Sequence, residues 1–144
     1  MADIVWVHGD CLRLTNPALV AVPGAPAIFV WDDALLHQRR ISLKRMVFMY
    51  EALLELPVSI YRGDVVAHVR MFAQQHQAMR IVTSASVAPR FRQIVTALQQ
   101  TQRVDVLPEP DFVQLPAASD VRRFTRYWRV AAPQLEEMAA RGAP

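Results

Sequence analysis

Short apolar runs alternate with longer amphipathic stretches along this chain. The first run, Ile4–Val7, is nearly continuous in apolar residues, as expected of a strand covered on both faces of a sheet. Four further runs are typical of strands: Ala27–Trp31, Pro57–Tyr61, Arg80–Thr83 and Val104–Leu107. Alternation of strands and helices predicts an α/β fold whose right-handed crossovers build a parallel sheet. We expect a Rossmann-like five-stranded sheet in the order 3-2-1-4-5, with helices on both faces and a C-terminal helix.

Helical patterns with recognisable start signals fill the intervals between the strands. Asn16 precedes Pro17, an arrangement typical of a helix N-terminus, and predicts a short helix through Val22. Further helices are predicted over Val65–Gln75 and Pro89–Gln100, each with apolar residues on one face.

The longest amphipathic pattern covers roughly Arg40–Leu56 and follows a polar connection after Asp33. Its apolar residues recur at intervals of three and four, which predicts a single helix with one buried stripe. The members of this stripe are Leu43, Met46, Val47, Tyr50, Leu53 and Leu54.

Prolines interrupt regular structure after the fifth strand, so residues 108–118 are expected to be extended. Ser119 or Asp120 is expected to cap a final helix that Pro133 interrupts or restarts. The predicted organisation is an α/β domain over residues 1–118. Residues 119–144 then form a helix and tail that belong to the same domain or serve as a docking element.

Composition places the chain among globular proteins. Of its 144 residues, 53% are hydrophobic and 20% are charged, which is typical of one domain with a substantial core. No apolar run approaches the roughly 18–20 residues that cross a bilayer. Asp3 stands where a signal peptide carries basic residues, so we expect a cytoplasmic protein without a transmembrane segment.

The charge distribution contains one basic cluster. The net charge of +3 arises from 16 basic and 13 acidic residues, and it is too small to demand a nucleic-acid partner. The cluster comprises Arg122, Arg123, Arg126 and Arg129. These arginines fit a face for a nucleic acid or an acidic partner, but a solvated helix face is the favoured interpretation.

Several motifs of catalytic or nucleotide-binding proteins are missing. None of the four glycines lies close to another, so the glycine-rich dinucleotide fingerprint and the P-loop are both absent. Ser84 and Ser86 lack the flanking glycines of a nucleophile elbow, which favours turn bonding for them. The single cysteine, Cys11, excludes an intramolecular disulfide, and the four scattered histidines predict no metal site.

The polar loop after the first strand is the candidate ligand site. In the predicted topology a crevice lies between the loops His8–Arg13 and Thr83–Val87, with Asp32 nearby. The candidate ligand-binding residues are His8, Asp10, Arg13, Asp32 and Ser84. They could hold the polar edge of a heterocycle or an anionic tail.

Two structural alternatives to this binding role remain open. Asp10 and Arg13 could pair with each other and hold the loop together. Trp6 and Trp31 could be core aromatics, or they could serve as stacking platforms.

The same loop carries a family resemblance. Trp6–Asp10 (WVHGD) and Leu12–Leu19 (LRLTNPAL) resemble the opening W-F-R-R-D-L-R-L-x-D-N-P-A-L of the DNA photolyase/cryptochrome family. Ile28–Asp32 (IFVWD), Arg90–Arg92 (RFR) and Phe124–Trp128 (FTRYW) are similar to later segments of that family's N-terminal domain. The chain therefore resembles a stand-alone N-terminal α/β domain, the part of the family that holds an antenna chromophore.

Three departures from the family pattern affect the expected function. His8-Gly9 replaces an arginine pair, Cys11 is an additional residue, and Ser84–Arg90 lacks the Asn-Glu pair that helps to hold a folate in some members. The resemblance also implies that the catalytic flavin pocket belongs to a helical domain that these 144 residues do not include. We therefore expect no enzymatic activity and no DNA repair by this chain alone.

Two main functions remain open at this point, beside a small-molecule-binding or enzymatic role in the wider nucleotide-binding α/β class. One is a non-catalytic interaction module, a subunit of a larger complex that needs no cofactor and docks through its last helix. The docking candidates are Arg122, Arg126, Tyr127 and Trp128. The other function, implied by the resemblance, is binding of an antenna-type chromophore such as a flavin or deazaflavin. Arg13 is then the expected cation for a phosphate tail.

Overall fold

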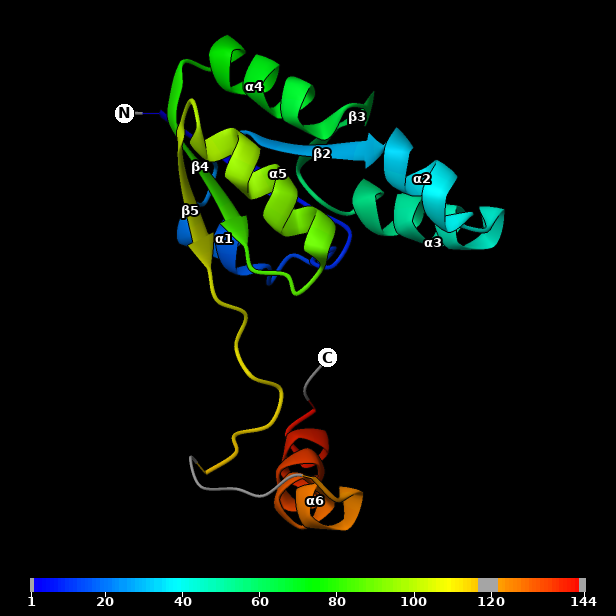
Figure 1. The fold of residues 1–144 in the computed structure, drawn as a ribbon. Coiled ribbons are helices and arrows are strands. Elements are labelled where there is room, and N and C mark those ends of the chain that lie inside the picture. The colour runs from blue at the N-terminus through cyan, green and yellow to red at the C-terminus, as the bar shows by residue number, and fades with distance from the viewer. Residues whose placement is uncertain (1, 117–121, 143–144) are drawn as a thin grey trace. The chain divides into compact units, whose positions relative to one another are not determined.

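The computed structural model describes residues 2–116 and 122–142 of the chain. It contains two compact units, Met1–Glu109 and Pro110–Pro144. The first unit carries the strands β1–β5 and the helices α1–α5, and the second carries α6 (Figure 1). The predicted domain boundary at residues 118 and 119 lies within the second unit, and the predicted caps Ser119 and Asp120 fall outside the described residues.

The first unit is built on a parallel sheet in the order β3-β2-β1-β4-β5, which confirms the predicted fold class. Its strands are β1 (Ala2–Val7), β2 (Ala27–Asp32), β3 (Val58–Gly63), β4 (Ala78–Ser84) and β5 (Arg103–Leu107). The central strand β1 is fully buried from Ile4 onward because helices cover both faces of the sheet. Its carboxyl end therefore opens at the topological switch point between β2 and β4.

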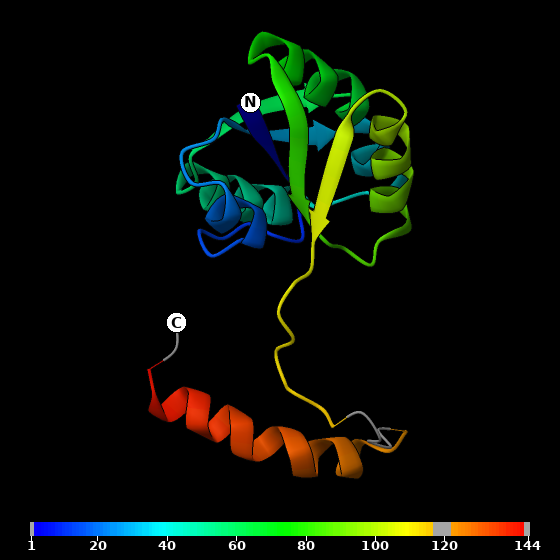
Figure 2. The ribbon, with the colours of Figure 1, turned by 90° about the vertical axis from the view of Figure 1, so that its left-hand side faces the viewer.

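Alternate residues of β1 belong to two separate cores. Ile4 and Trp6 pack against α4 (Val65–Gln75) and α5 (Pro89–Gln99). Val5 and Val7 pack on the other face, with residues of α1 (Pro17–Ala21) and α3 (Leu43–Leu54). Figures 1 and 2 show these two pairs of helices on opposite faces of the sheet.

The predicted long helix is present as α3, but the predicted polar connection before it is wrong. A separate helix, α2 (Asp33–Arg39), follows β2, and Arg62 of β3 holds its start through a hydrogen bond from Nε to Asp33 Oδ1 (2.6 Å). Arg40 adopts a left-handed conformation with φ of 45°, which ends α2. Ser42 then accepts the backbone N–H of Arg45, so α3 begins three residues after Arg40.

The predicted buried stripe of α3 is also wrong. Leu53 is buried, but Leu43 is 72% exposed and Leu54 is 63% exposed. Helix α3 meets the sheet with the side that carries Leu53 and the partly buried Met49. The sequence period identifies an amphipathic helix, but it does not determine which part of the apolar arc the sheet covers.

In the second unit, α6 (Phe124–Ala140) runs without a break through Pro133, so the predicted interruption is wrong. A proline inside a helix removes one backbone hydrogen bond but need not end the helix. Gln134 holds the preceding segment through two bonds of 2.8 Å, one to the N–H and one to the C=O of Gln114. Val113 and Ala131 are buried.

Candidate functional site

The loops that follow β1 and β4 are hydrogen-bonded to each other. His8 Nε2 donates to the carbonyl oxygen of Ser84 (2.6 Å), and the Ser86 hydroxyl donates to the Asp10 carboxylate. The predicted crevice between these two loops is therefore closed. This part of the prediction is wrong because the two loops satisfy each other's polar groups instead of leaving them for a ligand.

The protonation state of His8 follows from its two partners. Because Nε2 faces a carbonyl oxygen, it carries the proton, and Nδ1 accepts the backbone N–H of Asp10 (3.3 Å). Burial lowers the pKa of His8 and outweighs the bond to Ser84, which acts in the opposite direction. Both nitrogens of this neutral ring are bonded within the protein. The ring therefore holds the loop in position and offers no nitrogen to a ligand.

A closed polar cluster lies beside α1. Asn16 donates from Nδ2 to the Cys11 carbonyl (2.9 Å), and its Oδ1 accepts from the Ala18 N–H (2.9 Å) and the Ser84 hydroxyl (2.5 Å). Asn16 and Ser84 are fully buried. Asn16 thus caps α1 as predicted, and it also joins that helix to β4.

Glu109 holds the same loop from a distant part of the chain. Its carboxylate accepts from the Cys11 thiol (2.6 Å) and forms an ion pair with Arg13. Burial, followed by the adjacent carboxylate, raises the pKa of Cys11 to about 12, so the thiol stays protonated at neutral pH. Asp10 and Arg13 do not pair with each other, because Ser86 and Glu109 are their partners.

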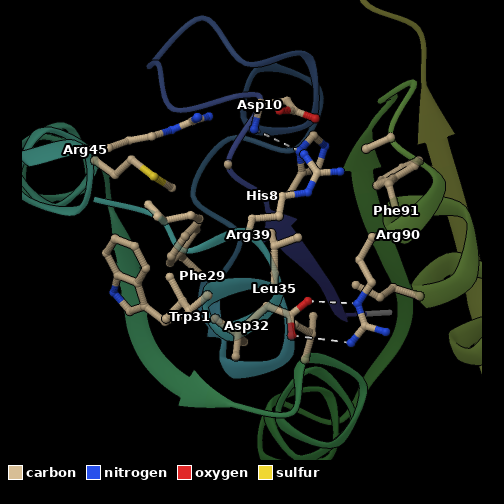
Figure 3. A pocket seen from close by; sticks show the side chains of 18 of the residues that line it. His8, Asp10, Phe29, Trp31, Asp32, Leu35, Arg39, Arg45, Arg90 and Phe91 are labelled. Atoms are coloured by element: carbon tan, nitrogen blue, oxygen red, sulfur yellow. Dashed lines mark hydrogen bonds and ion pairs between the residues drawn. The ribbon is translucent and has the colours of Figure 1, made fainter. Parts of the chain in front are cut away.

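An open cavity of about 500 Å³ lies at the carboxyl ends of β1 and β2, one strand away from the predicted crevice. This volume is in the range of small-molecule sites. Besides β1 and β2, it is bordered by α2, by the start of α3 and by the start of α5. Figure 3 shows Arg45 and Trp31 on one side of the cavity, and Arg90 and Phe91 on the other.

Aromatic rings form two walls of the cavity. Trp6 stacks on Phe91 with ring centroids 5.5 Å apart and an interplanar angle of 13°. On the other side, Phe29 and Trp31 meet edge to face at 5.3 Å. Trp6 is a buried core residue that also borders the cavity, whereas Trp31 is only partly buried.

The charges around the cavity are predominantly positive. Arg90 forms two hydrogen bonds to Asp32, of 2.9 and 3.3 Å, and this carboxylate raises the arginine's pKa. Arg39, Arg40 and Arg45 also line the cavity, and within residues 2–116 and 122–142 none of the three has an ion-pair partner. These three arginines were not predicted as site residues. Arg39 and Arg40 lie at the end of α2, a helix that was not predicted. Arg45 lies in the predicted helix α3, whose apolar pattern does not show which polar residue borders a cavity.

The structure separates the predicted ligand-binding residues. His8, Asp10 and Asp32 line the cavity, whereas Arg13 and Ser84 do not. No group of three or more metal-ligating side chains occurs among the described residues. Likewise, no helix in the described part of the chain is long and apolar enough to cross a membrane.

Three of the predicted docking residues, Arg126, Tyr127 and Trp128, lie in the first turns of α6, and Arg122 lies just before the helix. Trp128 is 47% exposed and stacks on Phe124, with ring centroids 5.8 Å apart. Tyr127 is partly buried, and Arg122 and Arg126 are exposed. Exposed aromatic rings next to cationic side chains fit a surface that another macromolecule covers.

Comparisons with known proteins support the fold. No family model matches the sequence, and no curated protein sequence matches it. Among solved structures, a bacterial class III photolyase from Agrobacterium tumefaciens matches 91% of the chain with a TM-score of 0.57 and 22% identity. The chain spans 31% of that photolyase's length. A hypothetical protein solved in a structural-genomics test case matches 76% of this chain and 97% of its own, with a TM-score of 0.48 and 11% identity.

The match to the photolyase shows a shared fold. The chain shares a Rossmann-like α/β fold with the photolyase, as the order of its strands independently shows. The resemblance in the loop after β1 and the similarity of fold therefore agree.

Proposed function

We propose that this protein binds an aromatic small molecule with an anionic group, of the flavin mononucleotide type, in the cavity at the ends of β1 and β2. The observation that carries the proposal is the pairing of two aromatic walls with three arginines that lack ion-pair partners in the described residues. Aromatic walls accept a planar ring, and guanidinium groups recognise phosphate or carboxylate. The fold shared with a class III photolyase makes a light-absorbing flavin the natural probe.

The proposed activity is binding without catalysis. Two groups of the loop after β1 have chemistry suited to catalysis, but both are engaged within the protein. Both ring nitrogens of His8 are bonded within the protein, and the raised pKa of Cys11 keeps its thiol protonated. Arg13 is not part of the proposed site, because it pairs with Glu109 outside the cavity.

Absorption spectroscopy and a flavin titration test this proposal. Natively purified protein should absorb beyond the aromatic protein band, or it should bind added flavin mononucleotide and quench its fluorescence. Trp31→Ala should weaken that binding about tenfold, since a stacking ring contributes on the order of 1–1.5 kcal/mol. Trp128→Ala is the matched control and should leave the affinity unchanged. A colourless protein that does not bind the flavin would contradict the proposal.

A second candidate function is an interaction module that docks through α6 on another protein. Phe124 is 70% exposed and stacks on the half-exposed Trp128, so a large aromatic surface faces solvent next to several arginines. Trp128→Ala should then abolish co-purification with a larger assembly while the folded α/β unit is retained. Persistence of the assembly in this variant would rule out docking through Trp128. Loss of the assembly on nuclease treatment would identify nucleic acid as the partner.

A further inference from the structure

Helix α3 carries a line of apolar side chains on its solvent-facing side. Leu43 is 72% exposed, Val47 and Tyr50 are each 48% exposed, and Leu54 is 63% exposed. These residues follow each other at intervals of four, three and four, so they lie on one side of the helix, along its whole length. We refer to these four residues as the α3 stripe. A continuous apolar line of this kind is a mark of a contact surface.

A shallow groove widens this surface on one side of the stripe. Its volume is about 330 Å³, and its lining residues are Trp31, Leu36, Met46, Val47, Tyr50 and Arg62. The groove therefore extends the apolar surface from α3 toward β2 and α2.

Charged residues border the other side of the stripe in a definite order. Lys44 lies near the amino end of α3, and Glu51 and Glu55 lie at its carboxyl end. At 100° per residue, all three fall on the same flank of the helix. None of the three has an ion-pair partner within residues 2–116 and 122–142.

We infer that the protein forms a symmetric dimer in which α3 packs antiparallel against α3 of a second copy. A two-fold axis that passes between residues 48 and 49 brings Leu43 opposite Leu54 of the second copy. The same axis brings Val47 opposite Tyr50 of the second copy. Each apolar residue of the α3 stripe then meets another member of the stripe, as an isologous interface requires.

The charged flank supports this choice of partner and register. The two-fold axis of an antiparallel pair is perpendicular to both helices. It brings each flank of α3 beside the same flank of α3 in the second copy, with the residues in reverse order along the helix. The axis that pairs the apolar residues then places Lys44 between Glu51 and Glu55 of the second copy. In a parallel pair related by a two-fold axis, this flank would instead meet the opposite flank of the second copy, so Lys44 would not lie between Glu51 and Glu55. The same two-fold axis therefore matches both the apolar residues and the charged residues of α3 with those of a second copy. Binding of a different partner protein would not require this match.

Sedimentation velocity of the full chain tests the inference, which does not depend on the proposed cavity ligand. The wild-type chain should be a dimer at about 100 µM, and Val47→Glu should be a monomer, because it places two carboxylates near the axis. Val87→Glu is the matched control: Val87 is 90% exposed in the loop after β4, and its replacement should leave the dimer intact. Circular dichroism should show the same helix content in all variants.

A charge reversal tests the antiparallel register. Lys44→Glu should weaken the dimer about tenfold or more, since it places three acidic residues together on each side of the axis. Adding Glu51→Lys and Glu55→Lys to Lys44→Glu should restore the dimer. A monomeric wild-type chain would overturn the inference, and so would a dimer that survives Val47→Glu. A dimer that is lost in Trp128→Ala but kept in Val47→Glu would place the interface on α6 and would also overturn it.

Discussion

The loop after β1 separates two regions that use polar side chains in opposite ways. On one side, Asn16 and Ser84 are fully buried, and they bond to each other and to the backbone of α1. On the other side, Arg39 and Arg45 border an open cavity and have no ion-pair partner among the described residues. The first region is a closed polar cluster, and the second is an open cationic cavity.

This difference suggests how one loop supports both the fold and a binding site. Buried polar groups stabilise a protein only when they are fully bonded, so the closed cluster leaves no group for a ligand. Exposed arginines contribute little to stability, so a site can keep them available. Substitutions in the closed cluster should therefore change stability, whereas substitutions in the cavity should change binding.

The largest effect is expected from Asn16→Ala in the closed cluster. The change removes the cap of α1 and leaves the Cys11 carbonyl and the Ser84 hydroxyl without their present partner. We expect the free energy of unfolding to fall by about 3 kcal/mol in urea denaturation. Ser42→Ala, which removes an exposed cap of α3, is the control and should cost about 1 kcal/mol. Equal losses in both variants would contradict the role given to the closed cluster.

His8 should give the protein a dependence of stability on pH. Burial lowers its pKa in the folded state, so the unfolded chain binds more protons in acid and the free energy of unfolding falls as pH falls. The loss of unfolding free energy should begin below about pH 6.5, the usual pKa of histidine. Between that pH and the pKa of His8 in the folded state, it should approach at most about 1.4 kcal/mol per pH unit. Urea denaturation at a series of pH values measures this slope.

His8→Gln should remove the contribution of His8 to that slope. A glutamine amide can donate to the Ser84 carbonyl and accept from the Asp10 N–H, as the neutral ring does. His37→Gln, at an exposed position of α2, is the control. If the unfolding free energy of His8→Gln depends on pH as it does in the wild type, the prediction that burial of His8 causes this dependence is wrong.

The smallest effect is expected from Arg13→Gln. Its ion pair with Glu109 is partly exposed, with 45% and 29% of the two side chains accessible. The loss in unfolding free energy should be below about 1 kcal/mol and should shrink in concentrated salt. Urea denaturation at low and high salt checks this prediction, and a larger loss that is independent of salt would show that Arg13 belongs to the closed cluster.

Local sequence signals predicted much of the scaffold. Asn16 before Pro17 marks a helix start that the structure confirms, and the alternation of elements predicted the strand order. The pairing of Arg13 with Glu109, 96 positions apart, could not be predicted because it depends on where the chain leaves β5. The cavity arginines were missed for a related reason. Arg39 and Arg40 lie at the end of α2, a seven-residue helix that is too short to show an apolar period, and the place of Arg45 depends on how α3 packs on the sheet.

A titration of flavin mononucleotide into three forms of the protein tests whether the cavity arginines bind the anionic group of a ligand. The three forms are the wild type, a variant with both Arg39→Gln and Arg45→Gln, and Arg13→Gln. We expect the wild type to bind the flavin and the double variant to bind it at least about tenfold more weakly, while the unfolding free energy of the double variant changes by less than about 0.5 kcal/mol. Arg13→Gln should bind like the wild type. Failure of the wild type to bind, or an equal loss of affinity in Arg13→Gln, would contradict the division between the closed cluster and the cavity.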